Sequence, residues 1–269
     1  MTRILTRGSK NGTCNICGED GKLTEDHTPP KGSVRITQVE MNHIVEILAA
    51  EPPGNRGRVS QNGVKYRTLC HRCNNDLLGL NYDPEFNSFV NQLATLVQSS
   101  MSLPTVINIT GKPQKIAKSL IGHLMAQRVN GYKKGAHTEP LRDWFLDINA
   151  PMPEYMQIVY WAYPYKTQVL ARDAFMRELT SEDTAYFWIM KFFPIAFMVL
   201  WDNPLGYTFS QRTFDRYRDI GSDEEVEIPI NITNLPHERW PEAPDDNRIC
   251  FFGSGAIGVM EKKSRRKHS

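Results

Sequence analysis

Two pairs of cysteines have the spacing of metal ligands. Cys14 and Cys17 form the first Cys-x-x-Cys pair, Cys70 and Cys73 form the second, and Cys250 stands apart. In a reducing compartment such pairs serve metal binding or redox chemistry rather than structural disulfides. Two such pairs match the tetrahedral Zn²⁺ site of four thiolates, which leaves no coordination position open for catalysis. We therefore expect a structural Zn²⁺ that joins two distant parts of the chain.

An acid, a histidine and an amide lie near these cysteines in the sequence. Asp26 and His27 end an expected strand between the two pairs, and Asn74 directly follows the fourth cysteine. Carboxylate and amide oxygens suit Mg²⁺ or Mn²⁺, and a histidine that is neutral near pH 7 can take a proton from water. Together these residues could hydrolyse a phosphodiester bond, with Asp26 and Asn74 holding the catalytic cation and His27 as the general base.

The ordered motif Cys-x-x-Cys, Asp-His, Cys-x-x-Cys-Asn covers roughly residues 13–80. It resembles the zinc-containing branch of the HNH endonucleases, also called His-Me finger or ββα-metal nucleases. The resemblance implies an enzyme that cuts nucleic acid, with DNA favoured. It implies that Asp26 binds the catalytic metal, that His27 polarises the attacking water and that Asn74 completes the metal site, while the four cysteines hold the structural zinc.

Each of these residues also has a simpler explanation. His27 can be an ordinary surface histidine beside an acid, and Asn74 can cap the helix expected after the fourth cysteine. Asn75 is a second candidate for the amide ligand, and His71 is a second candidate for a place at the zinc ion. The cysteine pairs alone would equally indicate a zinc ribbon that binds nucleic acid without cutting it.

Local basic residues, rather than the overall charge, are the candidates for phosphate contacts. The chain has 32 Lys and Arg against 30 Asp and Glu, a net charge of +2, which neither indicates nor excludes nucleic acid. Backbone contacts dominate the affinity for nucleic acid, and the candidates are Lys31, Arg35, Arg56, Arg58, Arg67 and Arg72. The basic run at 262–268 is either a further nonspecific contact or a solubilising tail.

The spacing of apolar residues predicts the elements that position these side chains. We expect strands over 22–27 and 64–69, a helix over Val39 to Ala50 and another that starts near Asn74. Beyond Asp83, helical spacing predicts amphipathic helices over 86–97 and 114–129. Further strands are expected over 105–109, 156–163, 168–176, 186–193, 195–200 and 226–232.

These elements predict an α+β protein in two parts. Residues 1–82 would form a small ββα zinc module, and residues 83–269 a larger α+β domain with a mostly antiparallel sheet. The most apolar stretch, 186–201, contains Lys191 and Pro194 and is shorter than the roughly 20 residues of a membrane helix.

The first residues lack the apolar core of a signal peptide, so we expect a cytoplasmic protein without membrane contact. Two questions about partners stay open at this point. The larger part is a candidate sensor for a ligand or partner protein that gates a nuclease, and the chain is a candidate homodimer.

Overall fold

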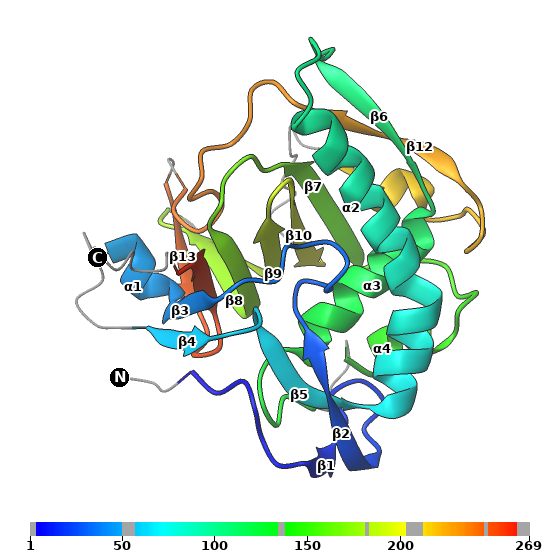
Figure 1. Cartoon of the computed structure of the whole chain (residues 1–269), viewed down its shortest axis with the longest axis vertical. Coiled ribbons are helices and arrows are strands. Elements are labelled where there is room, and N and C mark those ends of the chain that lie inside the picture. The colour runs from blue at the N-terminus through cyan, green and yellow to red at the C-terminus, as the bar shows by residue number, and fades with distance from the viewer. Residues whose placement is uncertain are drawn as a thin grey trace, which may run out of the picture.

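Mostly antiparallel strands and few helices make up this chain (Figure 1). The computed structural model describes residues 4–49, 57–133, 138–180, 183–202, 212–244 and 247–262. Within these residues the strands form a three-stranded sheet, a nine-stranded sheet and a two-stranded ribbon. The α+β class and the mostly antiparallel pairing expected from the sequence are confirmed.

A small antiparallel sheet and the helix after it carry the motif residues. The sheet has the order β1 (Asn11–Thr13), β2 (Asp20–His27) and β5 (Lys65–Cys70), and the π-helix η1 (Arg72–Tyr82) follows β5. At the end of η1 the backbone N–H of Asp83 donates to the carbonyl oxygen of Leu78, five residues earlier. The two predicted strands and the predicted helix are therefore present, and they place the motif on neighbouring elements.

Residues 39–49 form a strand and a short helix, so the helix predicted over Val39 to Ala50 is wrong in its first half. β3 (Val39–His43) is followed by α1 (Ile44–Ala49), and Ala50 lies outside the described residues. β3 pairs with β14 (Ile257–Glu261) on one side and with β4 (Arg58–Ser60) on the other. Residues 39–43 form a strand rather than a helix because β14, from the far end of the chain, supplies backbone hydrogen-bond partners that local spacing cannot reveal.

The nine-stranded sheet forms the centre of the molecule. Its order is β11-β7-β10-β9-β8-β14-β3-β4, and β13 pairs with the C-terminal half of β8, residues 174–178. The remaining strands are β7 (Met156–Ala162), β8 (Gln168–Glu178), β9 (Thr184–Phe192), β10 (Ile195–Trp201), β11 (Arg212–Thr213) and β13 (Arg248–Phe252). The predicted strands match β7 to β10 to within two residues at each end, whereas β11, β13 and β14 were not predicted.

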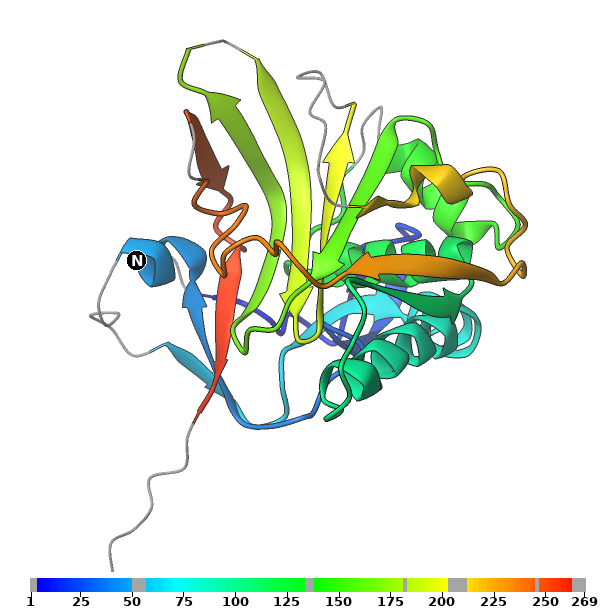
Figure 2. The ribbon, with the colours of Figure 1, turned by 90° about the horizontal axis from the view of Figure 1, so that it is seen from above.

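One face of this sheet is covered by helices (Figure 2). α2 (Asp83–Val97) packs Phe86 against Phe192 and Phe197 of the sheet. α3 (Pro113–Ala126) is buried along its whole length except for Lys115, so it is not the amphipathic helix that its spacing predicted. α4 (Thr138–Leu146), the short 3₁₀ helix η2 (Phe214–Tyr217) and the ribbon of β6 (Val106–Gly111) and β12 (Val226–Asn231) complete this layer.

A single hydrophobic cluster joins the motif-bearing elements to the rest of the chain. It contains Leu69 and Leu78 together with Phe86, Leu120 and Phe197. The expected boundary between residues 82 and 83 falls where η1 runs directly into α2. The small sheet packs on α3 through β2 and β5, and α3 packs on β8 and β9 of the large sheet.

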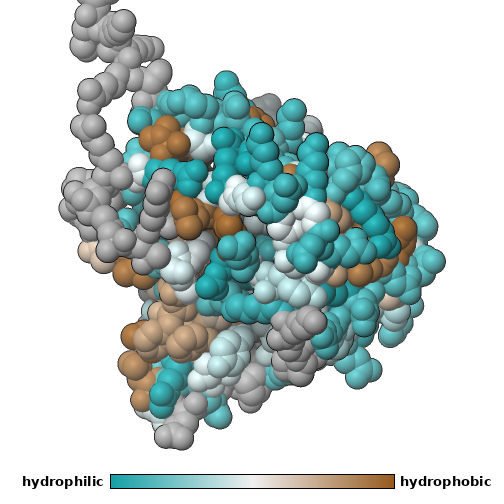
Figure 3. All heavy atoms as spheres, turned by 90° about the horizontal axis from the view of Figure 1, so that it is seen from below, coloured by the Kyte–Doolittle hydropathy of each residue, from teal (hydrophilic) through white to brown (hydrophobic). Residues whose placement is uncertain are grey.

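The face drawn in Figure 3 is mostly hydrophilic, with apolar side chains gathered in a few small groups. None of the described helices is both long enough and apolar enough to cross a membrane.

Candidate metal centre and neighbouring cleft

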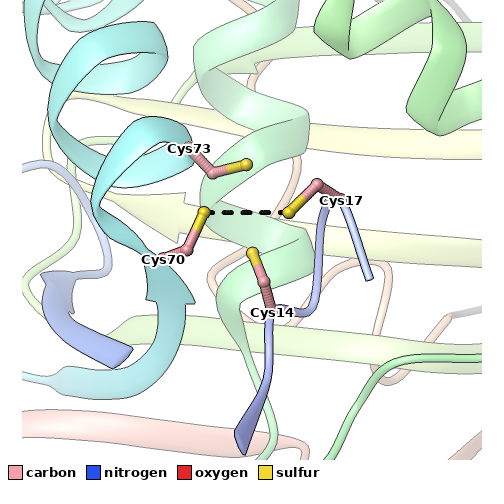
Figure 4. Close-up of side chains that lie close together, drawn as sticks. All are labelled: Cys14, Cys17, Cys70 and Cys73. Atoms are coloured by element: carbon pink, nitrogen blue, oxygen red, sulfur yellow. Dashed lines mark hydrogen bonds between the residues drawn. The ribbon is translucent and has the colours of Figure 1, made fainter. Parts of the chain in front are cut away.

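The four paired cysteines converge at one point (Figure 4). All four Sγ atoms lie within 4.8 Å of one another, and those of Cys17 and Cys70 are 3.7 Å apart. Sulfur atoms at 2.3 Å from a tetrahedrally coordinated Zn²⁺ would be separated by about 3.8 Å. The cluster could therefore bind a zinc ion through four thiolates.

Two sharp changes of chain direction bring the cysteine pairs together. Cys14 accepts a backbone hydrogen bond from Gly18 at 3.0 Å, and Gly18 has a φ of +78°, a conformation that glycine adopts without strain. Cys70 ends β5 and Cys73 lies in the first turn of η1. Because β5 pairs with β2, the second pair is held beside the turn that carries the first.

The pKa values of the clustered thiols differ. A hydrogen bond from Cys73 lowers the pKa of Cys14 to about 5, whereas burial raises the pKa of Cys17 to about 12. A thiolate at Cys14 surrounded by three other sulfur atoms makes the cluster rich in electron density. Thiolates are the ligand form for zinc, so this arrangement suits a bound cation.

Asp26 is a buried carboxyl group near the end of β2. Its Oδ2 lies 2.8 Å from Nδ1 of His123 and 3.3 Å from the hydroxyl of Thr28, which donates to it. Burial raises the pKa of Asp26, and the nearby His123 partly offsets this effect. The carboxylate is thus held in place by the side chain of Thr28, directly after β2, and by that of His123 on α3.

His27 is half-buried and ends β2. Burial lowers its pKa, and the positive charges of Lys65 and Lys31 lower it further. The imidazole is therefore neutral near pH 7, which is the form that can accept a proton.

Asn74 ties η1 to β2. Its Nδ2 donates to the hydroxyl of Thr24 at 2.8 Å and to the backbone carbonyl of Glu25 at 3.2 Å. Both bonds use the amide nitrogen, so the amide oxygen has its lone pairs available for another partner. The alternative in which Asn74 caps η1 does not fit, because His71 occupies the N-cap position and makes no side-chain capping bond.

The predicted catalytic residues line one cleft of about 510 Å³. Asp26, His27 and Asn74 all contribute to its wall, together with Lys31, Asp83 and His123. Asn75 and His71 also line the cleft; His71 lies beside Asp76 at 3.6 Å and is not a member of the cysteine cluster. The structure thus brings the acid, the histidine and the amide together, as the sequence interpretation requires.

His123 and Asp83 belong to this cleft but carried no signal in the sequence. Nε2 of His123 lies 2.9 Å from Oδ1 of Asp83, while Nδ1 contacts Asp26. Although burial alone would raise the pKa of Asp83, the charge of His123 and its hydrogen bond lower it. The contact from His123 to Asp26 spans 97 residues, and only the packing of α3 under β2 creates it.

The predicted phosphate contacts have different surroundings. Lys31 lines the cleft, and Arg35 lines a neighbouring groove of about 850 Å³ together with Lys166. Arg72 is exposed, whereas the guanidinium of Arg67 bonds to Glu25 at 2.7 Å.

Arg58 donates to the carbonyl oxygen of Ile4 at 2.6 Å. Arg56 and residues 263–268 of the basic run lie outside the described residues. Among the predicted basic residues that the structure describes, Lys31 is therefore the one that lines the same cleft as the candidate catalytic groups.

Comparison of the chain with protein-family models, with curated proteins and with solved structures gave no match. Neither a family nor a relative therefore contributes to the functional assignment. The assignment rests on the residues of the cleft and on the cysteine cluster.

Proposed function

We propose that this chain is a metal-dependent endonuclease of the HNH type. The observation that carries the proposal is that the adjacent Asp26 and His27 line one cleft with Asn74, which is distant from them in sequence, beside a four-cysteine cluster. The supporting geometry is a pair of antiparallel strands followed by a helix, β2, β5 and η1, which together hold all three residues.

Each residue of the cleft has a separate role in phosphodiester hydrolysis. His27, neutral near pH 7, takes a proton from a water molecule that attacks phosphorus in line with the leaving oxygen. The carboxylate of Asp26 and the amide oxygen of Asn74 would hold Mg²⁺ or Mn²⁺, which when bound supplies positive charge for the scissile phosphate. Lys31 at the rim binds a neighbouring phosphate group of the substrate.

The cysteine cluster has a structural role in this proposal. Four thiolates would saturate Zn²⁺ and leave no position for water or substrate. The zinc ion would fix the turn after β1 relative to the start of η1, and through them β2 relative to Asn74. DNA is the favoured substrate, with RNA as the alternative polymer.

A cleavage assay with matched histidine variants tests the proposal. The zinc-loaded protein is incubated with supercoiled plasmid and Mg²⁺ or Mn²⁺, and parallel reactions contain single-stranded DNA and RNA. His27→Ala should lower the cleavage rate by about 10²- to 10⁴-fold, the usual contribution of a general base. His71→Ala is the control, because His71 is exposed on the same cleft and has no assigned role in the reaction.

Cleavage by His27→Ala at the wild-type rate would remove the proposed mechanism. Binding of nucleic acid without nicking, under every metal condition, would instead favour a non-catalytic zinc module. Zinc content and melting temperature of both variants should equal those of the wild type, because neither histidine contributes to the core or to the cysteine cluster.

A further inference from the structure

His123 reaches the candidate catalytic cleft from α3, outside the motif that carries the proposed function. Its side chain is 1% exposed, and both ring nitrogens face carboxylates, Asp26 at 2.8 Å and Asp83 at 2.9 Å. When both nitrogens donate to the carboxylates beside them, the ring is an imidazolium. Although burial lowers the pKa of His123, the two carboxylates raise it to about 10.

The contact with His123 leaves one oxygen of Asp26 available. Oδ2 accepts from His123 and lies 3.3 Å from the hydroxyl of Thr28. Among the described residues, no group donates a hydrogen bond to Oδ1 of Asp26, and Asp26 lines the cleft. A carboxylate anchored through one oxygen is restricted to one rotamer, so its other oxygen is oriented before any ligand arrives.

The opposite nitrogen of His123 is anchored just as firmly. Oδ1 of Asp83 accepts from His123 and also from the hydroxyl of Ser119 at 2.8 Å. Asp83 lies where η1 runs into α2, so helical backbone on both sides fixes its position. The imidazolium is thus held between α2 and β2 while its own backbone belongs to α3.

We propose that His123 is a positioning residue that orients the carboxylate of Asp26 to bind a divalent cation in the cleft. Asp83 acts on the cation indirectly, because it fixes the orientation of the imidazole ring. The inference rests on the proposed function only in giving Asp26 the role of a cation ligand. Hydrogen-bonded neighbours of metal ligands typically change metal affinity by about 10- to 100-fold when they are removed.

Two amide substitutions separate the two contacts of His123. The amide nitrogen of Asn is as many bonds from Cα as Nδ1 of His, so His123→Asn can retain the contact with Asp26. The amide nitrogen of Gln matches Nε2, so His123→Gln can retain the contact with Asp83 and lose the one with Asp26. Because each variant loses one of the two contacts, each serves as the control for the effect of a lost hydrogen bond on the stability of the other.

The test is a titration of the zinc-loaded full chain with Mn²⁺, followed by electron paramagnetic resonance of the free ion. We expect His123→Gln to weaken Mn²⁺ binding by about 10-fold or more, and His123→Asn to stay within a few-fold of the wild type. Asp26→Asn should abolish the binding, which identifies the titrated site. Melting temperatures of the two His123 variants check that both remain folded.

Equal Mn²⁺ affinity in the Asn and Gln variants would overturn the positioning role, as would a wild-type protein that binds no Mn²⁺. The titration is independent of cleavage. Selective weakening in His123→Gln, in a protein that cuts no nucleic acid, would support the positioning role and contradict the nuclease proposal.

Discussion

The side chains of this site differ in how firmly their neighbours hold them. The four thiols of the cysteine cluster lie within 4.8 Å of one another. Asp26 is buried but is compensated by the imidazolium of His123. The carboxylate can therefore be accommodated without a metal ion, whereas several thiolates together would repel one another without a cation.

This difference predicts the result of removing one cysteine. Cys70→Ser should lose the zinc ion and most of the stability that metal binding gives the small sheet, since structural zinc sites of this kind contribute about 10 kcal/mol or more of apparent binding free energy. Metal analysis by mass spectrometry and the thermal melting curve measure the two effects. A chelator strong enough to remove zinc from the wild type should produce the same melting curve.

Cys250→Ser is the matched control, because Cys250 lies on β13 and is not a member of the cluster. It should keep one zinc ion per chain. Full zinc content and an unchanged melting temperature in Cys70→Ser would contradict a tetrathiolate site.

At the scale of elements, α3 is the helix on which the cleft is built. It contributes His123, and through Gly122 it approaches η1 closely, since a Cβ at Gly122 would lie 2.6 Å from carbons of both Leu78 and Phe145. The small sheet is bound to the end of the same helix. Asn15 donates to the carbonyl oxygens of Met125 and Arg128.

The close contact at Gly122 predicts that a small substitution there is destabilising. Gly122→Ala gains about 1 kcal/mol of helix propensity, but the methyl group forces Leu78 and Phe145 apart. Overpacking of a core typically costs about 1–3 kcal/mol. We expect a net loss of stability in urea unfolding and weaker Mn²⁺ binding, because η1 carries Asn74.

Gly79→Ala is the control on the facing helix. Gly79 is exposed, and a Cβ there would meet only the carbonyl oxygen of Asn74, at 3.4 Å. This substitution should leave stability unchanged or raise it by up to about 1 kcal/mol. A Gly122→Ala protein more stable than Gly79→Ala would show that α3 and η1 are not packed as described.

At the scale of the whole molecule, the motif-bearing part depends on the rest of the chain. The hydroxyl of Thr68 on β5 donates to the carbonyl of Ala126 at 2.6 Å, and Leu78 shares the hydrophobic cluster with residues of α3 and the large sheet. β3 and β4, which interrupt the motif in sequence, belong to the large sheet, because β3 pairs with β14 and β4 pairs with β3.

Residues 1–82 by themselves should therefore bind zinc but lack a cooperative fold and nuclease activity. The fragment would expose the apolar side of η1 and would have no His123 to orient Asp26. Zinc analysis, the cooperativity of thermal melting and plasmid cleavage by the fragment and the full chain make the comparison. A chain that ends at residue 262 is the control and should behave as the full chain does. Wild-type cleavage by the 1–82 fragment would contradict this dependence.

The sequence by itself determined the features that rest on local spacing. The two Cys-x-x-Cys pairs predicted one four-thiol cluster, and runs of apolar residues predicted β7 to β10 because a buried strand is apolar whatever its neighbours are. The Asp-His pair and the Asn after the last cysteine indicated which side chains would line a common cleft.

Tertiary structure alone decided the parts that depend on distant partners. Whether Val39 to His43 is a helix or a strand is set by β14, more than 200 residues away, whose backbone pairs with it. His123 has the spacing of a helix residue in the sequence, and it becomes a charged neighbour of Asp26 only because α3 is buried on all sides. Side chains that are brought together by packing leave no periodic pattern in the sequence, because such a contact does not require a fixed number of residues between its partners.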